Sequence, residues 1–410
     1  MFHFTGYLNF LFSNKRFLGF GFFMLMASSV GQTYFIGIFG PAIRTEFNLT
    51  HTSWSAIYMI GTLLSATLLP YTGKKIDEMP LTRYATFVIL LLFMASTFIA
   101  FVPSITFLIV AIFLLRHAGQ GLMSLTGTIA MARYFFADRG KALAIASMGF
   151  SFGEMTLPVL MVIAITTIGW RYTYGISALI VLLFVLPLAL WLLKGQAIRH
   201  ERFEELKQAS EYGNKSAASW TRRKVLRDFR FYLLMPAALA TSFVSTALFF
   251  HHLSLAELKG WDVMWFTANY WVYALGATLA MLVSGLLIDK FTALRVLPTF
   301  LLPLAVGLLI VWKLDNAWWA WPYLFFLGVS SGLSHTGFPA LWAEVYGVNS
   351  LGAIKSLFVS LSVFASALGP LVMGLMIDNG ILVEQVCLSF ALYCLISSYV
   401  FVIGLRLYKH

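Results

Sequence analysis

Two ionisable side chains lie deep within long apolar stretches of the sequence, where a charge is costly. At about 1.5 Å per helical residue, Arg116 lies about 25 Å from Arg133, and Glu154 lies about 20 Å from Lys141. Charges at such depth in a membrane are usually functional or paired. We therefore expect Arg116 to bind an anionic substrate and Glu154 to carry a proton. A fixed structural ion pair between these two residues is the alternative interpretation.

Pro158 supports the assignment of Glu154. Proline has no backbone N–H, so the carbonyl of Glu154, four residues earlier, loses its helical hydrogen-bond donor. A carboxyl group and a freed carbonyl at one position of the membrane suit the handling of protons or cations. A simple kink in the helix is the alternative.

Further polar residues within the apolar stretches are candidates for the wall of a substrate cavity. Gln120, Ser124 and Gly127 follow Arg116 at helical spacing, which fits either a cavity wall or a close helix contact, and we single out Gln120. Adjacent histidines point about 100° apart on a helix, so at most one of His251 and His252 faces a cavity, and we assign His251 to proton coupling. The other candidate substrate-binding residues are Gln32, Tyr34, Asn269, Tyr270 and His335.

Other kinds of chemistry have no motif in the sequence. It has no phosphate-binding loop, no metal-ligand cluster and no pairing of a nucleophile with a base, so we expect neither an enzyme nor a bound cofactor or metal. The two cysteines, Cys387 and Cys394, are interpreted as packing residues. The net charge of +11 would suggest nucleic acid in a soluble protein, but these cations lie in short loops between apolar stretches, which excludes that partner.

The composition predicts an all-α membrane protein. Of the 410 residues, 60% are hydrophobic and 11% are charged, whereas soluble domains have about 25% charged residues. The mean hydropathy of +0.83 requires most of the surface to face lipid. Stretches long enough to cross a bilayer predict twelve transmembrane helices at 17–40, 53–72, 83–102, 105–131, 142–165, 173–193, 232–254, 264–288, 294–312, 319–342, 353–377 and 382–405.

The distribution of cations predicts the orientation of the chain. With both termini inside, 23 Lys and Arg residues fall in inner segments and four in outer segments. We therefore expect both termini in the cytoplasm and, as the location, a bacterial inner (plasma) membrane. The domains are an N-terminal six-helix bundle at 1–193, a mixed-charge cytoplasmic linker at 194–230 and a C-terminal six-helix bundle at 231–410. The linker is interpreted as a solvated connection, with a regulatory role as the alternative.

An internal repeat relates the two halves. A shift of 212 residues superposes several features at corresponding places, which indicates a duplication of the kind common in transporters. The loop after the second predicted helix is thereby repeated after the eighth, and we assign both loops to gating. The gating residues are Gly73, Asp77 and Arg83 in the first loop, with Gly285, Asp289 and Arg295 in the second.

These motifs carry a family resemblance. The loop Gly73-Lys-Lys-Ile-Asp77-Glu-Met-Pro-Leu-Thr-Arg83 resembles the signature loop of the major facilitator superfamily, and Arg116-His-Ala-Gly119-Gln120-Gly121 is similar to its arginine and glycine motif. Within the superfamily, 133–141 and Gly169-Trp170-Arg171 resemble the monocarboxylate-porter and oxalate/formate-antiporter branch. The resemblance implies two six-helix bundles around a central cavity, which alternate in access.

From these observations we expect a secondary active transporter of a small organic anion, such as a monocarboxylate, driven by protons or another coupling ion. The resemblance implies an arginine for the substrate carboxylate in the eighth span, but the stretch 264–288 contains no Lys or Arg, so we assign the anion to Arg116. The expected partners are the small-molecule substrate, the coupling ion and the lipid bilayer, and the expected state is a monomer. Two alternatives stay open: efflux of an amphipathic compound or siderophore by the same fold, and a signalling or assembly protein that does not transport.

Overall fold

The computed structural model describes residues 4–135, 138–196, 199, 222–346 and 351–407, and in this part of the chain it is helical without a strand. Eleven helical segments are long and apolar enough to cross a membrane by length and composition. A further helix, α18 (Ala320–Tyr346), has the length of a span but does not meet the same hydropathy criterion. Its middle carries Ser330, Ser331, Ser334, His335 and Thr336. The predicted all-α membrane fold is confirmed.

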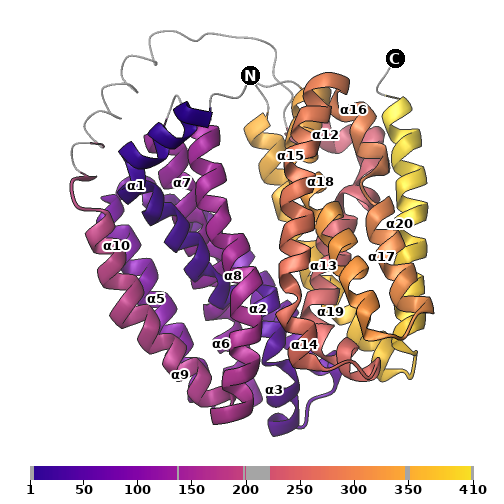
Figure 1. Ribbon diagram of the computed structural model, residues 1–410, viewed down its shortest axis with the longest axis horizontal. Coiled ribbons are helices and arrows are strands. Elements are labelled where there is room, and N and C mark those ends of the chain that lie inside the picture. Colours follow the sequence, from indigo (N-terminus) through magenta and orange to yellow (C-terminus); the bar gives the residue numbers. More distant parts are fainter. Residues whose placement is uncertain (1–3, 136–137, 197–198, 200–221, 347–350, 408–410) are drawn as a thin grey trace. The chain divides into compact units, whose positions relative to one another are not determined.

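The chain divides into two compact units (Figure 1). The first comprises 1–39 and 60–216, and the second comprises 40–59 and 217–410. Helix α4 (His51–Glu78) therefore begins in the second unit and continues into the first. Most of the predicted linker at 194–230 lies outside the described residues, and the division at 193 and 231 stays a prediction.

The first unit contains spans that are interrupted by other helical forms. The first span runs through α1 (Phe4–Ala27), a 3-10 turn (Ser28–Gly31) and α2 (Thr33–Ile38). The fourth joins α6 (Ile105–Leu115), a π-helical segment (Arg116–Met123) and α7 (Ser124–Tyr134). The others are α5 (Leu81–Ala100), α8 (Arg139–Ile168), and α9 (Trp170–Ile180), which continues through a π-helical turn (Val181–Val185) into α10 (Leu186–Leu192).

The second unit begins with α3 (Gly40–Phe47), which packs on α13 (Phe229–Leu258). Asp378 at the end of α19 (Leu351–Asp378) accepts hydrogen bonds from the backbone N–H groups of His51 and Thr52, at 3.1 and 2.7 Å. It thereby caps α4. The remaining helices are α12 (Arg222–Arg227), α14 (Val263–Ala268), α15 (Tyr270–Phe291), α16 (Ala293–Val296), α17 (Leu302–Lys313) and α20 (Val383–Arg406).

Glycines let α15 and α18 pack backbone against backbone. A Cβ atom on Gly328 would lie 2.1 Å from the carbonyl oxygen of Tyr273, and one on Gly332 would lie 2.3 Å from that of Ala277. From the other side, a Cβ on Gly276 would lie 2.5 Å from the carbonyl oxygen of Phe325. Small residues at such crossings are typical of membrane helices, where close packing drives association.

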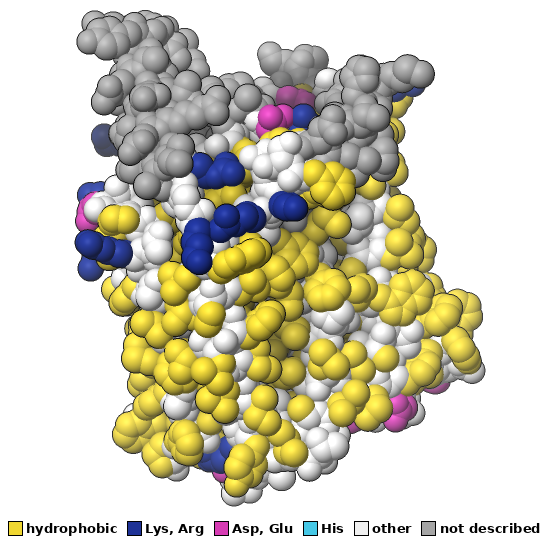
Figure 2. Space-filling model, turned by 60° about the vertical axis from the view of Figure 1, so that its left-hand side comes forward, with side chains coloured by type: hydrophobic (Ala, Val, Ile, Leu, Met, Phe, Trp, Pro, Cys, Tyr) yellow, Lys and Arg dark blue, Asp and Glu magenta, His cyan; other side chains and the backbone are white. Residues whose placement is uncertain are grey.

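The predicted span limits agree with the helices to within a few residues except at the N-terminus and at the end of the second span, where α4 continues to Glu78 and includes Gly73 and Asp77 of the predicted loop. At the N-terminus, α1 begins at Phe4, whereas the apolar stretch begins at residue 17. The guanidinium of Arg16 donates to the carbonyl oxygen of Trp191 at 2.6 Å and lies over the ring of that residue. The helix thus extends beyond the apolar stretch, and its Arg16 side chain is held by Trp191. Figure 2 shows Lys and Arg gathered toward one end of this face and hydrophobic side chains over its middle.

Candidate functional site

The first span is broken in the middle of the first unit. The helix α1 passes into the 3-10 turn Ser28–Gly31, and Gln32 is extended, with φ −82° and ψ 156°, before α2 begins. Ser28, Ser29 and Gly31 are buried. Non-helical backbone at membrane depth is tolerated only where it is buried in protein or lines a cavity, so such a break is a common place for a binding site.

The break lies directly against the fourth span at a crossing of two glycines. A Cβ on Gly31 would lie 2.2 Å from the carbonyl oxygen of Leu115, and a Cβ on Gly119 would lie 2.6 Å from the nitrogen of Gly31. No other residue type fits at either position without movement of the backbone. The two interrupted segments therefore meet in direct contact, which brings their irregular backbone together in one place.

Arg116 stands at this crossing with its side chain fully buried. Its Nη1 donates to the carbonyl oxygen of Gly31 at 3.0 Å and to the hydroxyl of Thr33 at 3.4 Å, and its Nε donates to the hydroxyl of Thr62 at 3.1 Å. These three acceptors are neutral. The broken first span thus supplies a carbonyl that orients the guanidinium, and α4 supplies a hydroxyl.

A π-helical segment begins at Arg116 and runs to Met123. A π turn adds a residue to the helical turn, and such insertions are frequent at functional sites. The segment therefore changes the direction of the side chains that follow. Gln120 is half-buried here, and its amide makes no hydrogen bond with the other described residues. It is available to a ligand.

Glu154 lies in α8 and is 7% exposed. Among the described residues it has neither a hydrogen-bond partner nor an ion-pair partner, so the structure does not contain the predicted alternative of an ion pair with Arg116. Its neighbour Gly153 packs on the first span, where a Cβ would lie 2.3 Å from the hydroxyl of Ser29. Pro158 is inside the same helix, as expected.

Gln32 and Tyr34 belong to the same group. The amide nitrogen of Gln32 donates to the hydroxyl of Ser124 at 3.4 Å, and the hydroxyl of Tyr34 donates to that of Ser29 at 2.6 Å. Gln32 therefore connects the break to the fourth span. The structure brings together, around one break, the five residues that were predicted from the first half: Gln32, Tyr34, Arg116, Gln120 and Glu154.

Three candidates of the second unit, Asn269, Tyr270 and His251, lie next to one another around His252, whereas His335 lies farther along α18. Tyr270 hydrogen-bonds through its hydroxyl to Nδ1 of His252 at 2.8 Å. Nε2 of His251 lies 3.0 Å from the carbonyl oxygen of Pro370. Asn269 accepts from the indole N–H of Trp321 at 2.9 Å, which fixes an aromatic side chain near the start of α18. His335, in the middle of α18, has an exposed side chain.

Two buried histidines were not singled out from the sequence. His252 lies between two tyrosines, because its Nε2 hydrogen-bonds to the hydroxyl of Tyr323 at 2.8 Å. His117 lies next to Arg116, 3.1 Å from the hydroxyl of Thr72 and 3.4 Å from that of Ser65. The adjacency of His117 to the buried arginine was the available signal for it. For His252, the sequence indicated only that one of the two adjacent histidines could face a cavity, without deciding which.

Comparison with known proteins decides the family. Residues 19–405 match the family model of the Major Facilitator Superfamily. The chain belongs to this superfamily. The match covers both units, and the fold is that of a secondary transporter, an integral membrane protein with a small-molecule substrate. No curated protein matches the sequence at a significant level.

Solved structures of other superfamily members share this fold. A bacterial homologue of the human lysosomal transporter Spinster, in an inward-facing and unoccupied conformation, is 13% identical, with a TM-score of 0.72 over 97% of this chain and 98% of that one. The nucleoside transporter NupG is 12% identical, with a TM-score of 0.69 over 95% of this chain and 98% of that one. At such identities the likeness shows the fold alone.

The superfamily signature loop is connected to the fourth span. Arg133, near the end of α7, forms an ion pair with Asp77 and donates to the carbonyl oxygen of Ile76 at 3.2 Å. A Cβ on Gly73 would lie 2.7 Å from the side chain of Leu125, so this glycine permits the close approach of α4. Arg83 is exposed. Gly73 and Asp77 thus lie in the last turns of α4, and this end of α4 is held to α7 at Asp77.

The corresponding superfamily loop of the second unit is held in another way. The carboxylate of Glu344, near the end of α18, accepts from the backbone N–H groups of Ala293 and Leu294, at 2.7 and 3.2 Å. Nothing lies within 4 Å of a Cβ on Gly285. Arg295 is exposed, and the side chain of Asp289 lies outside the described residues. In the first unit, a guanidinium near the end of the fourth span contacts the end of α4. In the second unit, a carboxylate near the end of the tenth span contacts the segment that follows α15.

Proposed function

We propose that this protein is a proton-coupled secondary transporter of a small organic anion, with a monocarboxylate as the first candidate. The transport cycle is alternating access by a monomer in a bacterial inner membrane, with both termini cytoplasmic. Arg116 binds the anion, Gln120 and Gln32 add amide hydrogen bonds, and Glu154 carries the proton. Tyr34, Asn269, Tyr270, His335 and His251 are secondary candidates, and the gating residues are those of the two signature loops.

The observation that carries this proposal is the position of Arg116. A guanidinium is fully buried at a broken helix, oriented by a carbonyl and two hydroxyls, with an uncommitted amide one turn away. A planar guanidinium binds a carboxylate through two parallel hydrogen bonds, which suits recognition of a small anion. Burial of such a charge is costly, which favours a functional use.

Glu154 supports proton coupling. An ionised carboxylate that is buried without a cation is unfavourable, so a carboxyl in this place favours binding a proton whenever its surroundings become more negative. An anion bound in the same unit makes them more negative. Binding of substrate and binding of a proton therefore favour each other, and thermodynamic linkage makes this coupling reciprocal.

The test begins with a thermal-shift screen of metabolites on the purified protein. Nucleosides belong in this screen beside monocarboxylates, because a nucleoside transporter shares the fold. Once a stabilising anion is identified, Arg116→Lys should raise the Kd for that anion about tenfold or more. The reason is that an ammonium is a point charge, whereas a planar guanidinium makes two parallel hydrogen bonds to a carboxylate. Arg171→Lys is the matched control, because Arg171 donates to the backbone carbonyl oxygens of Ala100 and Val102, at 2.9 and 2.8 Å, away from the candidate site.

The double variant Arg116→Ala with Glu154→Ala separates a binding role from a structural one. If Arg116 binds the substrate, the double variant folds and still fails to bind the anion. Recovery of near-normal binding when both charges are removed would defeat the proposal. A screen in which only neutral or cationic compounds stabilise the protein would defeat it too, in favour of another substrate class.

A further inference from the structure

A short basic helix precedes the seventh span. Helix α12 (Arg222–Arg227) has the sequence Arg-Arg-Lys-Val-Leu-Arg and is followed at once by α13, which begins at Phe229. Val225 is fully buried, and α12 packs on α13 and α19. The side chains of Arg223, Lys224 and Arg227 are exposed. The helix thus has Val225 in the core and these three cations on the outside.

Hydrophobic side chains are exposed beside these cations. Leu226 is 43% exposed, Phe229 is 66% exposed and Tyr232 is 54% exposed. The hydroxyl of Tyr232 donates to the carbonyl oxygen of Leu226 at 2.9 Å, which connects the first turn of α13 back to α12. Apolar and aromatic side chains next to cations, at the beginning of a span, are typical of the boundary between hydrocarbon and lipid headgroups.

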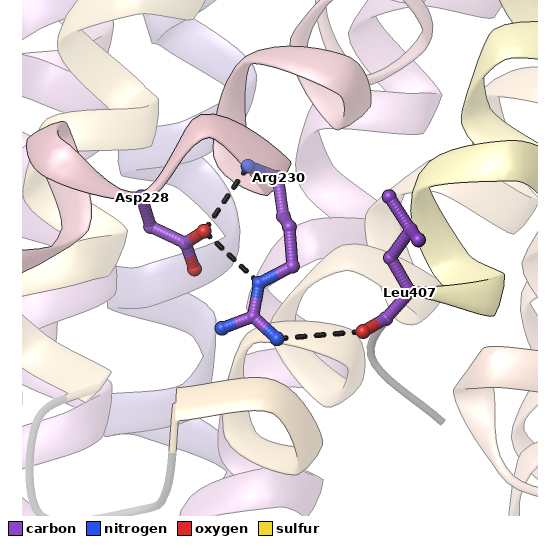
Figure 3. A network of polar contacts seen from close by, with 3 residues as sticks. All are labelled: Asp228, Arg230 and Leu407. Carbon is purple, nitrogen blue, oxygen red and sulfur yellow. Dashed lines mark hydrogen bonds and ion pairs between the residues drawn. The ribbon is translucent and has the colours of Figure 1, made fainter. Parts of the chain in front are cut away.

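The segment is held in a fixed place by a polar network (Figure 3). Asp228 caps α13 by accepting from the backbone N–H of Arg230 at 3.0 Å, and it accepts from Nε of the same residue at 3.0 Å. Nη1 of Arg230 donates to the carbonyl oxygen of Leu407, just after α20, at 3.4 Å. This arginine is therefore engaged within the protein. The network fixes the start of α13, which directly follows α12.

We propose that the surface of Arg223, Lys224, Arg227, Leu226 and Phe229, here called the α12 surface, binds the headgroup of an anionic phospholipid. The cations contact the phosphate, and the two hydrophobic side chains enter the acyl region beside it. Charge complementarity favours this occupant, since the patch joins basic and apolar groups where a span begins. The inference holds for either membrane face, because α12 adjoins the end of a span whichever way the chain inserts. It is independent of the proposed substrate.

The experiment compares the protein in nanodiscs of phosphatidylcholine alone with nanodiscs that also contain phosphatidylglycerol. Native mass spectrometry counts the anionic lipids retained, and thermal unfolding measures the stabilisation that they give. A cation at an anionic surface contributes about 1 kcal/mol, or about a fivefold change in affinity. The triple variant Arg223→Gln, Lys224→Gln and Arg227→Gln should therefore lose at least tenfold in affinity for phosphatidylglycerol. Its unfolding in pure phosphatidylcholine should be unchanged.

Two matched variants make the result specific. A second triple variant removes three exposed cations elsewhere: Lys15→Gln, Lys194→Gln and Lys290→Gln. It should keep the affinity for phosphatidylglycerol. Arg223→Lys with Arg227→Lys keeps the charge and should retain most of the affinity. Equal losses in both triple variants, or none in the α12 variant, would overturn the proposal. So would equal stabilisation by soluble polyglutamate in neutral lipid, because the surface would then recognise an acidic polymer without a membrane.

Discussion

Gly31 and Gly119 meet with their backbones in contact, so that a Cβ on Gly119 would lie 2.6 Å from the nitrogen of Gly31. This contact sets the distance between the broken first span and the π-helical segment of the fourth. It also holds the carbonyl of Gly31 within reach of Arg116, at 3.0 Å. The geometry of the candidate site therefore depends on the absence of two side chains.

Gly119→Ala should separate the two spans and damage the site. We expect a loss of about 1–3 kcal/mol in stability from overpacking, together with weaker binding of the substrate. Thermal unfolding and a titration with the substrate measure the two effects. Gly175→Ala in α9 is the control, because nothing lies within 4 Å of a Cβ there and alanine favours a helix by up to about 1 kcal/mol. Wild-type stability and affinity in Gly119→Ala would contradict the importance of this crossing.

Glu154→Gln should uncouple transport from the proton gradient. The amide has nearly the same shape but cannot release a proton, so accumulation driven by a gradient should be lost while counterflow exchange continues. Both are measured in proteoliposomes with radiolabelled substrate. Glu257→Gln, at an exposed carboxyl of α13, should accumulate substrate normally. Unimpaired uptake by Glu154→Gln would remove Glu154 from the coupling mechanism.

Asp77→Asn should alter the transport rate severalfold with little change in substrate affinity. The ion pair with Arg133 joins α4 to α7, and Asp77 is exposed, so its contribution to stability is small, about 0–1 kcal/mol. Its effect should appear in the rate at which the conformations interchange. The pair of Lys74 and Glu78, 3.7 Å apart within α4, is the control, since Glu78→Gln breaks a pair that joins no second helix. Equal rates in wild type and Asp77→Asn would argue against a gating role.

The cytoplasmic location of the N-terminus can be tested by labelling. In a background with Cys387→Ala and Cys394→Ala, Ser13→Cys should be protected from an impermeant maleimide in intact cells. Ser104→Cys, in the exposed connection between α5 and α6, should react. Reaction at position 13 together with protection at position 104 would reverse the orientation that the 23 to 4 distribution of cations predicts.

The sequence predicted the helical framework because hydrophobic length and cation placement are strong signals of membrane spans. Even the weak boundary between the third and fourth spans falls within a few residues of Ala100 and Ile105. The buried Arg116 was also recognisable, since a charge within a span is conspicuous in any hydropathy profile. A charge within an apolar stretch can therefore be recognised from composition alone.

The interruptions of the helices were not predictable in the same way. Hydropathy does not register one extra residue in a turn, so neither the π-helical segment at Arg116 nor the 3-10 turn at Ser28 could be seen. Counting residues gave Arg116 and Glu154 similar depths, which suggested an ion pair that the structure does not contain. Counting residues gives only the position of a side chain along the helix axis. The direction of each side chain depends on helical phase, and the π-helical segment changes that phase.

The polarity of α18 bears on how the protein is made. A nascent helix that carries three serines, a threonine and a histidine in its middle is a poor substrate for insertion on its own, because each polar group must leave water. α15 is synthesised earlier and supplies hydroxyl partners for two of these groups, because Tyr273 donates to Ser331 at 3.1 Å and Ser284 hydrogen-bonds to Thr336 at 2.6 Å. We therefore expect α18 to enter the bilayer together with α15. Insertion of the second unit should then depend on α15 staying beside the translocon until α18 emerges from the ribosome.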